Sequence, residues 1–162
     1  MDAIKRLREE TGAGVMDCKR ALEDASGDVE KARSLLRERG IERAEKRSGR
    51  EATQGLVHSY VHGGRIGVLV EVNCETDFVA RTEDFKHLVH EIALQVASSN
   101  PTYVSREDIP DASSDTPKQS VLLEQEYIRD GRRTIRDLVQ ETIAKTGENI
   151  RVRRFVRFEL GQ

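Results

Sequence analysis

The chain has 162 residues, 36% of them hydrophobic and 35% charged, a composition typical of a soluble globular protein with a modest core. Its 27 basic and 29 acidic residues give a net charge of -2, which excludes a global electrostatic reason to bind nucleic acid or an anionic membrane. Two cysteines cannot make a disulfide framework, and no apolar run approaches the ~20 residues of a membrane span. Because the N-terminus has no apolar signal core, we expect a cytoplasmic protein.

Residues 1–40 are expected to form a small three-helix domain, because apolar residues recur there at helical spacing in three short runs. Gly12–Gly14 breaks the first run, and Asp28 is a suitable N-cap for the third helix, which should end before Gly40. Residues 41–53 are highly charged and nearly free of apolar side chains. We interpret them as a solvated linker, either helical or extended, rather than a phosphate-binding patch, since the aromatic side chains common in nucleic-acid sites are missing.

After the linker the period of the apolar residues changes to two, which predicts β-strands. Two alternating runs, 56–62 and 65–74, are joined at Gly63–Gly64, and glycine tolerates the positive φ that a hairpin turn needs. A third alternating run, 150–160, predicts a closing strand that adds at an edge of the hairpin. We therefore expect an α+β core over residues 54–162, with a three-stranded antiparallel sheet and flanking helices.

The closing strand shows one apolar stripe that Arg154 interrupts. The opposite face of this strand should be the solvent side of a half-covered sheet, and it carries Arg151, Arg153 and Arg157. The apolar stripe consists of Ile150, Val152, Val156, Phe158 and Leu160.

Helical spacing predicts a long helix from about Glu83 to Asn100, which Thr82 can cap. A loop is expected over 105–115. Thr116–Gln119 combines an N-cap, a first-turn proline and a capping-box glutamine, so a further helix is expected to begin there. A last helix should lie between Gly131 and Gly147.

Catalytic constellations are sparse. The chain has no Gly-rich phosphate loop, and His87 and His90 share a helical i, i+3 spacing without an evident third metal ligand. His58 and His62 would lie about 13 Å apart along a strand, too far to share one ion. Cys74 falls on the apolar face of its strand and is interpreted as a small buried hydrophobe. We expect no catalytic residue, no metal site and no cofactor, and hence a protein that is not an enzyme.

Two places in the sequence combine apolar side chains with positions where exposure is possible. Phe78, one of only 4 phenylalanines, stands at a strand-to-helix corner next to Asp77. It either packs on the helix that it precedes or is held out for a partner, and composition alone favours the first alternative. In the N-terminal domain the adjacent Val15 and Met16 cannot both face one core, so at least one of them should be exposed.

Two long stretches, LREETGAGVMDCKRAL at 7–22 and EVNCETDFVAR at 71–81, closely resemble motifs of the elongation factor Ts family. The segment GENIRVRR at 147–154 resembles a third motif, and the resemblance covers nearly the whole chain. It implies a nucleotide exchange factor that binds the translational GTPase elongation factor Tu in its GDP-bound and nucleotide-free forms. No covalent chemistry belongs to that role.

The resemblance also implies roles for particular residues. The N-terminal domain would resemble a ubiquitin-associated domain and dock on the GTPase domain through Arg8, Val15 and Met16. Phe78 would wedge between two helices beside the nucleotide site and thereby disturb magnesium and phosphate binding, which reverses the preference from composition. The motif that dislocates magnesium would consist of Thr76, Asp77, Phe78 and Val79.

The resemblance further implies that the helix from Phe85 to Val96 touches a β-barrel domain of the GTPase. This sequence has Leu94 and Gln95 where relatives can carry methionine and histidine, which weakens that expectation.

The core has room for only one of the two related halves found in longer members of the family. The short form pairs two chains, which predicts a homodimer through the sheet or through the helices after Thr116. An alternative of another class is a small RNA-associated or ubiquitin-like-binding adaptor, suggested by the three-helix domain and the arginines at 151–157. Strong salt-dependent RNA binding would favour that alternative.

Overall fold

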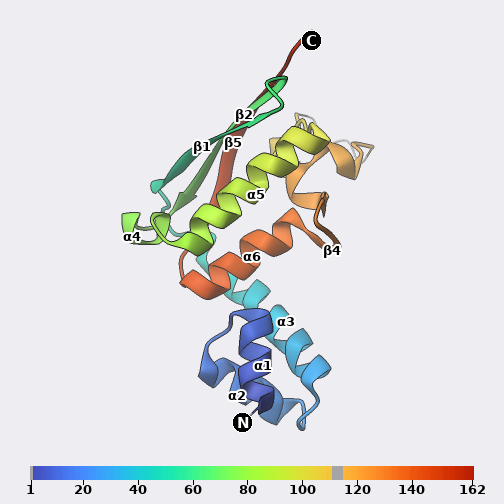
Figure 1. Ribbon diagram of the computed structural model, residues 1–162. Helices are drawn as coiled ribbons and strands as arrows, with labels where there is room; N and C mark the ends of the chain where they lie inside the picture. The colour runs from blue at the N-terminus through green and yellow to red at the C-terminus, as the bar shows by residue number, and fades with distance from the viewer. Residues whose placement is uncertain (1, 111–114) are drawn as a thin grey trace. The chain divides into compact units, whose positions relative to one another are not determined.

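The computed structural model describes residues 2–110 and 115–162, which form two compact units (Figure 1). The helical unit comprises the chain up to Glu51 together with Gln140–Asn149, and the sheet unit comprises Ala52–Val139 and Ile150–Gln162. Helices together with a three-stranded antiparallel sheet confirm the expected α+β class. Among the described residues, no helix has the length and apolar character needed to cross a membrane.

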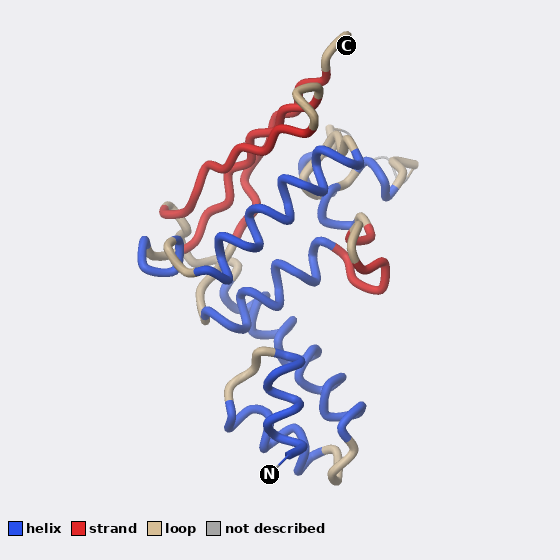
Figure 2. Tube along the Cα trace, viewed as in Figure 1, coloured by secondary structure: helices blue, strands red, loops and turns tan. Residues whose placement is uncertain are grey.

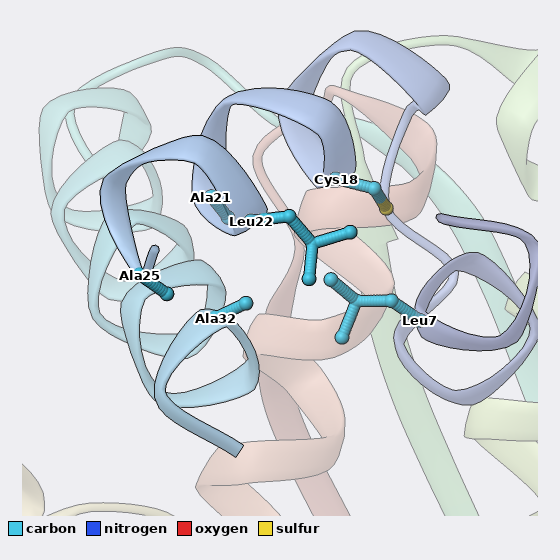
Figure 3. Close-up of a cluster of buried hydrophobic side chains, with 6 residues drawn as sticks. All are labelled: Leu7, Cys18, Ala21, Leu22, Ala25 and Ala32. Carbon is cyan, nitrogen blue, oxygen red and sulfur yellow. The ribbon is translucent and has the colours of Figure 1, made fainter. Parts of the chain in front are cut away.

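The helical unit begins with α1 (Asp2–Thr11), α2 (Val15–Asp24) and α3 (Val29–Arg47). Asp28 caps α3 as expected, because its side chain accepts a hydrogen bond from the backbone N–H of Lys31. The three helices enclose a small core of mainly alanine and leucine side chains (Figure 3). Its buried members are Leu7, Cys18, Ala21, Leu22, Ala25 and Ala32.

The third helix does not end before Gly40, because α3 continues to Arg47; the first part of the predicted linker is therefore helical, which is one of the two conformations expected for it. A single glycine inside a helix costs only about 1 kcal/mol, and the charged residues that follow Gly40 are good helix formers. Burial of Ala44 adds an apolar contact to this extension. Residues 41–47 are therefore the last turns of a helix, and the amide of Asn149 donates to the carbonyl of Arg50 (2.8 Å) just beyond them.

The sheet unit contains β1 (Gln54–His62), β2 (Ile66–Cys74) and β5 (Arg151–Glu159) in the order β1-β2-β5. Figure 2 draws these strands in red. Both pairings are antiparallel, as expected, so β2 is the central strand. Gly63 and Gly64 both have positive φ at the β1–β2 turn, which confirms the reason for glycine at this hairpin.

The pairing of β2 with β5 contains a bulge that changes which residues of β5 are buried. Glu71 lies opposite Arg154 while Val72 lies opposite Val152, so Arg153 is the extra residue. Because one extra residue moves every later side chain to the other face, the predicted single apolar stripe is divided. Val152 is buried, whereas Val156 and Phe158 are exposed on the opposite face.

The same bulge overturns the expectation that Arg157 lies on the solvent side. The side chain of Arg157 is only 10% exposed and lies on the face of the sheet that bears Val68, its partner in the ladder. Its guanidinium donates to the carbonyl of Ala97 and pairs with Glu159. Arg151 and Arg153 are exposed, as expected.

One face of the sheet is covered by α5 (Glu83–Ser99), which packs against β1 and β2 (Figure 1). Its apolar stripe, which includes the fully buried Phe85, makes the core of the sheet unit. The expected cap is confirmed, since the Thr82 hydroxyl accepts from the backbone N–H of Phe85.

No α-helix begins at Thr116, so that prediction is wrong. The chain instead forms short 3-10 turns at Lys118–Ser120 and Leu122–Glu124, followed by the hairpin of β3 (Glu126–Tyr127) and β4 (Asp130–Thr134). A helix through this segment would turn Tyr127 away from Val121 and Gln125, yet all three side chains are buried. The buried residues are Val121, Leu122, Gln125 and Tyr127.

The last helix, α6 (Ile135–Thr146), lies between the expected glycines. A 3-10 turn, Arg106–Asp108, interrupts the expected loop over 105–115, of which residues 111–114 lie outside the described residues.

Candidate functional site

The corner between β2 and α5 contains a one-turn helix, α4 (Asp77–Ala80), that the spacing of apolar residues does not reveal. Thr76 is its N-cap, with a side chain that accepts from the backbone N–H of Val79 (3.3 Å). The buried thiol of Cys74 contacts the Thr76 carbonyl oxygen at 3.1 Å, at the point where the strand becomes the helix. Local hydrogen bonds thus fix the backbone on both sides of Phe78.

Phe78 points away from the core, with 77% of its surface exposed, while Val79 and Ala80 are buried. Burying such a side chain would gain roughly 1.5–3 kcal/mol, and the chain leaves this gain unused. Phe78 is therefore exposed and does not pack on the following helix, while its being held out for a partner stays a prediction. Beside it, the exposed carboxylate of Asp77 forms an ion pair with Arg81 (2.8 Å).

A second set of exposed apolar side chains lies in the helical unit, at the first turn of α2. Val15 and Met16 are 50% and 58% exposed, so both of these neighbours face solvent. Arg8 is also exposed, near the end of α1. The opposite side of α2 is buried in the small core, and Asp17 is held by both terminal nitrogens of Arg43 (2.9 and 3.0 Å).

Within the described residues, no group of three or more His, Cys, Asp or Glu side chains could hold a metal ion. Both cysteines are buried, and burial raises the pKa of the Cys18 thiol above its usual value, which disfavours a reactive thiolate. The arrangement is thus suited to recognition by exposed apolar side chains on fixed backbone.

Comparison with known proteins gives this pattern a family. The sequence model described as "Elongation factor TS" matches residues 20–120. A curated elongation factor Ts from Thermoanaerobacter sp. (strain X514) is 52% identical over 191 residues, covering 99% of this chain and 94% of the relative. The elongation factor Ts of Coprothermobacter proteolyticus is 52% identical over 98% of this chain and 96% of its own length. This chain belongs to the elongation factor Ts family.

Membership in the elongation factor Ts family makes the chain a translation elongation factor. The elongation factor Ts of Thermotoga neapolitana, 48% identical, matches over 100% of this chain, so the likeness includes the helical unit with Arg8, Val15 and Met16. The matched family region, residues 20–120, includes α4 and its flanks.

Gln95 has a structural role that its place in the sequence does not reveal. Its side chain is buried within the sheet unit, where its amide nitrogen donates to the Gln125 side chain (3.0 Å) and the Glu126 carbonyl (3.1 Å). Its amide oxygen accepts from the backbone N–H of Ile128 (3.0 Å). Gln95 therefore holds the segment around β3 onto α5 and does not present its side chain to solvent.

The buried Glu91 reinforces the same contact, because the Tyr127 hydroxyl donates to its carboxylate (2.5 Å) and Arg129 pairs with it. Burial and this hydrogen bond raise the pKa of Tyr127 to about 12. Tyr127 is thus a hydrogen-bond donor throughout the physiological pH range.

A contact between two histidines, on β1 and α5, was not predicted from the sequence. Nε2 of His58 lies 3.1 Å from Nδ1 of His90, and the Tyr60 ring packs edge-on against His90. Burial, and then the neighbouring His90, lower the pKa of His58. The alternation of β1 places His58 on the covered face, which is the one signal in the sequence for this contact.

Proposed function

We propose that this protein binds elongation factor Tu·GDP and promotes release of GDP and its exchange for GTP. Phe78 is the observation that carries the proposal: a mostly exposed aromatic side chain mounted on a corner whose neighbours are buried, within the motif that resembles elongation factor Ts. The role needs no covalent chemistry, so the protein would act as an exchange factor and not as an enzyme. Its place of action would be the cytoplasm.

Exchange follows from thermodynamic linkage. A factor that binds the nucleotide-free GTPase more tightly than the GDP-bound form weakens GDP binding by the same ratio. A magnesium ion is a large part of the charge that neutralises bound phosphates, so its displacement favours release of the nucleotide. This chain would supply the differential binding, while the partner supplies magnesium and nucleotide.

The two exposed regions would have separate tasks in this scheme. Arg8, Val15 and Met16 would dock on the GTPase domain. Phe78 would insert between two helices of that domain, with Thr76, Asp77 and Val79 forming the turn that presents it. Packed helices have discrete arrangements, so a rigid wedge shifts them from one to another and displaces magnesium.

The first experiment replaces the wedge. Elongation factor Tu loaded with fluorescent GDP is mixed with increasing amounts of this protein, and the maximal release rate and half-saturating concentration are recorded. We expect Phe78→Ala to lower the maximal rate by on the order of tenfold or more, about 1.4 kcal/mol of transition-state stabilisation for each factor of ten. Ile128→Ala, which truncates another exposed apolar side chain of the sheet unit, is the matched control.

No acceleration by the wild-type protein would refute the exchange function, and a wild-type rate for Phe78→Ala would refute the wedge. Met16→Ala serves as the complement: it should raise the half-saturating concentration several-fold with the maximal rate preserved, because docking and wedging are separate steps.

We also propose that the protein is a homodimer that pairs through the uncovered face of the sheet. Residues paired directly across neighbouring antiparallel strands point to the same side of the sheet, so the outer face is continuous across the three strands. It bears large apolar side chains that are 42–70% exposed, and such a patch is typical of an interface. Its apolar members are Val57, Val61, Leu69, Val156 and Phe158.

Light scattering coupled to gel filtration tests the dimer. The wild-type protein should elute with twice the chain mass, and Val156→Glu, which places a charge opposite Leu69, should elute as a monomer. A monomeric wild-type protein would refute the dimer. If Val156→Glu were still a dimer, the interface would have to lie elsewhere than on this face.

A further inference from the structure

The carbonyl of Val79, next to Phe78 in the sequence, receives two hydrogen bonds from a single residue. Thr82 donates to it through its backbone N–H (3.0 Å) and through its hydroxyl (2.7 Å). The same hydroxyl oxygen accepts from the backbone N–H of Phe85 (3.4 Å), at the start of α5. One side-chain oxygen therefore joins the end of α4 to the beginning of α5.

This link matters because α4 is too short to hold its own geometry. A helix of four residues has scarcely more than the unfavourable nucleus of helix formation, so its conformation has to be imposed from outside. On the N-terminal side the imposed contacts come from Thr76 and Cys74. On the C-terminal side the hydroxyl of Thr82 ties α4 to Phe85, which is fully buried in the core.

We propose that Thr82 is a positioning residue for nucleotide exchange, whose hydroxyl transmits the rigidity of the core to α4 and fixes the direction of the Phe78 wedge. The proposal rests on the function proposed above. Thr82 need not touch the GTPase for this role. It acts through Phe78, and a small displacement of a positioned group is known to have a large effect on rate.

The first test replaces the hydroxyl by a methyl group of similar size. Thr82→Val should lower the maximal rate of GDP release at least about threefold and leave the half-saturating concentration unchanged, because docking through the helical unit is intact. Thr82→Ser keeps the hydroxyl and should restore the wild-type rate. Circular dichroism melts establish that each variant is folded.

Thr146→Val is the matched control, since the Thr146 hydroxyl also donates to a preceding carbonyl and accepts from a following backbone N–H, in the helical unit. Its hydroxyl donates to the Thr142 carbonyl (2.8 Å) and accepts from the backbone N–H of Glu148 (3.4 Å). If the loss of any such hydroxyl slowed exchange through general loosening, Thr146→Val would slow it as well. We expect it to exchange at the wild-type rate.

Thr82→Asp separates the two bonds of the hydroxyl and also serves if the valine variant fails to fold. A carboxylate is a good N-cap and can still accept from Phe85, but it cannot donate to Val79 and repels that carbonyl. The maximal rate should therefore fall in Thr82→Asp although α5 keeps its cap. A wild-type rate for this variant would overturn the proposal.

A double-mutant cycle shows whether Thr82 acts through Phe78. In the Phe78→Ala background, Thr82→Val should produce no further loss, because the wedge that it positions is already absent. An equal loss in both backgrounds would overturn the proposal and leave exchange by Phe78 standing. Failure of the wild-type protein to accelerate release would instead refute the underlying function.

Discussion

The interior of the helical unit and that of the sheet unit are stabilised by different kinds of interaction. The buried cluster between the first three helices of the helical unit consists of two leucines, three alanines and a cysteine, whereas the sheet unit buries Phe85 and many branched side chains. Burial of large apolar surface contributes far more stability than burial of alanine. The sheet unit can therefore carry an exposed phenylalanine on a fixed corner, and the helical unit needs other interactions.

Ion pairs between helices are the additional interactions of the helical unit. Along α3, Arg33 pairs with Glu10 of α1, while Arg39 and Arg43 pair with Asp24 and Asp17 of α2. Partly exposed pairs of this kind each contribute little, because water and salt screen them, but several of them act together here. We therefore expect the stability of the helical unit to depend on salt more strongly than that of the sheet core.

The largest effect should come from Phe85→Ala in the sheet unit, at a loss of about 3–5 kcal/mol because a cavity opens in the core. Phe78→Ala, seven positions earlier, deletes the same atoms from an exposed side chain. It leaves no cavity and should change stability by no more than about 0.5 kcal/mol. Urea unfolding monitored by circular dichroism measures both. Similar losses for the two variants would mean that Phe78 is packed, contrary to its exposure.

A smaller effect is expected for Arg43→Met, which keeps most of the apolar stem but removes the pair with Asp17. The helical unit should lose up to about 1 kcal/mol at low salt, with a smaller loss at 1 M salt. Amide hydrogen exchange along α2 reports this change locally. A loss that does not depend on salt would attribute the effect to packing instead.

Changes of pH should have the smallest effects on stability, and the two units should respond at different pH values. The pKa of His58 is lowered from its ordinary 6.5, so its contribution is fully present above pH 6.5 and is lost as the pH falls below that value. Arg43 lowers the pKa of Asp17 from 3.8, and Arg6 and then Arg33 lower that of Glu10 from 4.5, so these contributions are lost only in stronger acid.

Hydrogen exchange between about pH 5 and pH 7 tests this order, since only the sheet unit should lose protection in that range. His58→Gln should flatten the change, because glutamine carries no proton to gain. An equal slope in the variant would show that another group titrates.

Features that depend on local chemistry could be predicted from the sequence. Asp28 and Thr82 were recognisable as caps, and Gly63–Gly64 as a hairpin turn, because each forms its bonds within three residues. The exposure of Phe78 is different, since composition favoured burial and only the motif pointed to exposure. A pattern of apolar residues alone does not reveal why one of them is kept outside.

Features that depend on distant partners could not be predicted. The contact of His58 with His90 joins residues 32 positions apart, and the capping-box pattern at Thr116 was overruled by the burial of Val121, Leu122, Gln125 and Tyr127. The bulge on β5 depends on its register with β2, which β5 does not encode by itself. Tertiary context overrode the local pattern in each of these places.

The bulge at Arg153 also bears on how this strand can change length during evolution. Loss of Arg153 itself would leave a regular ladder in which Val156 still faces Leu69, so the outer surface would keep its apolar character. Loss of one residue between Arg154 and Phe158 would instead exchange inner and outer side chains beyond that point. Two deletions of one residue each, a few positions apart, would thus have different consequences. The first would leave the two faces of the sheet unchanged, and the second would place inner side chains on the outer face.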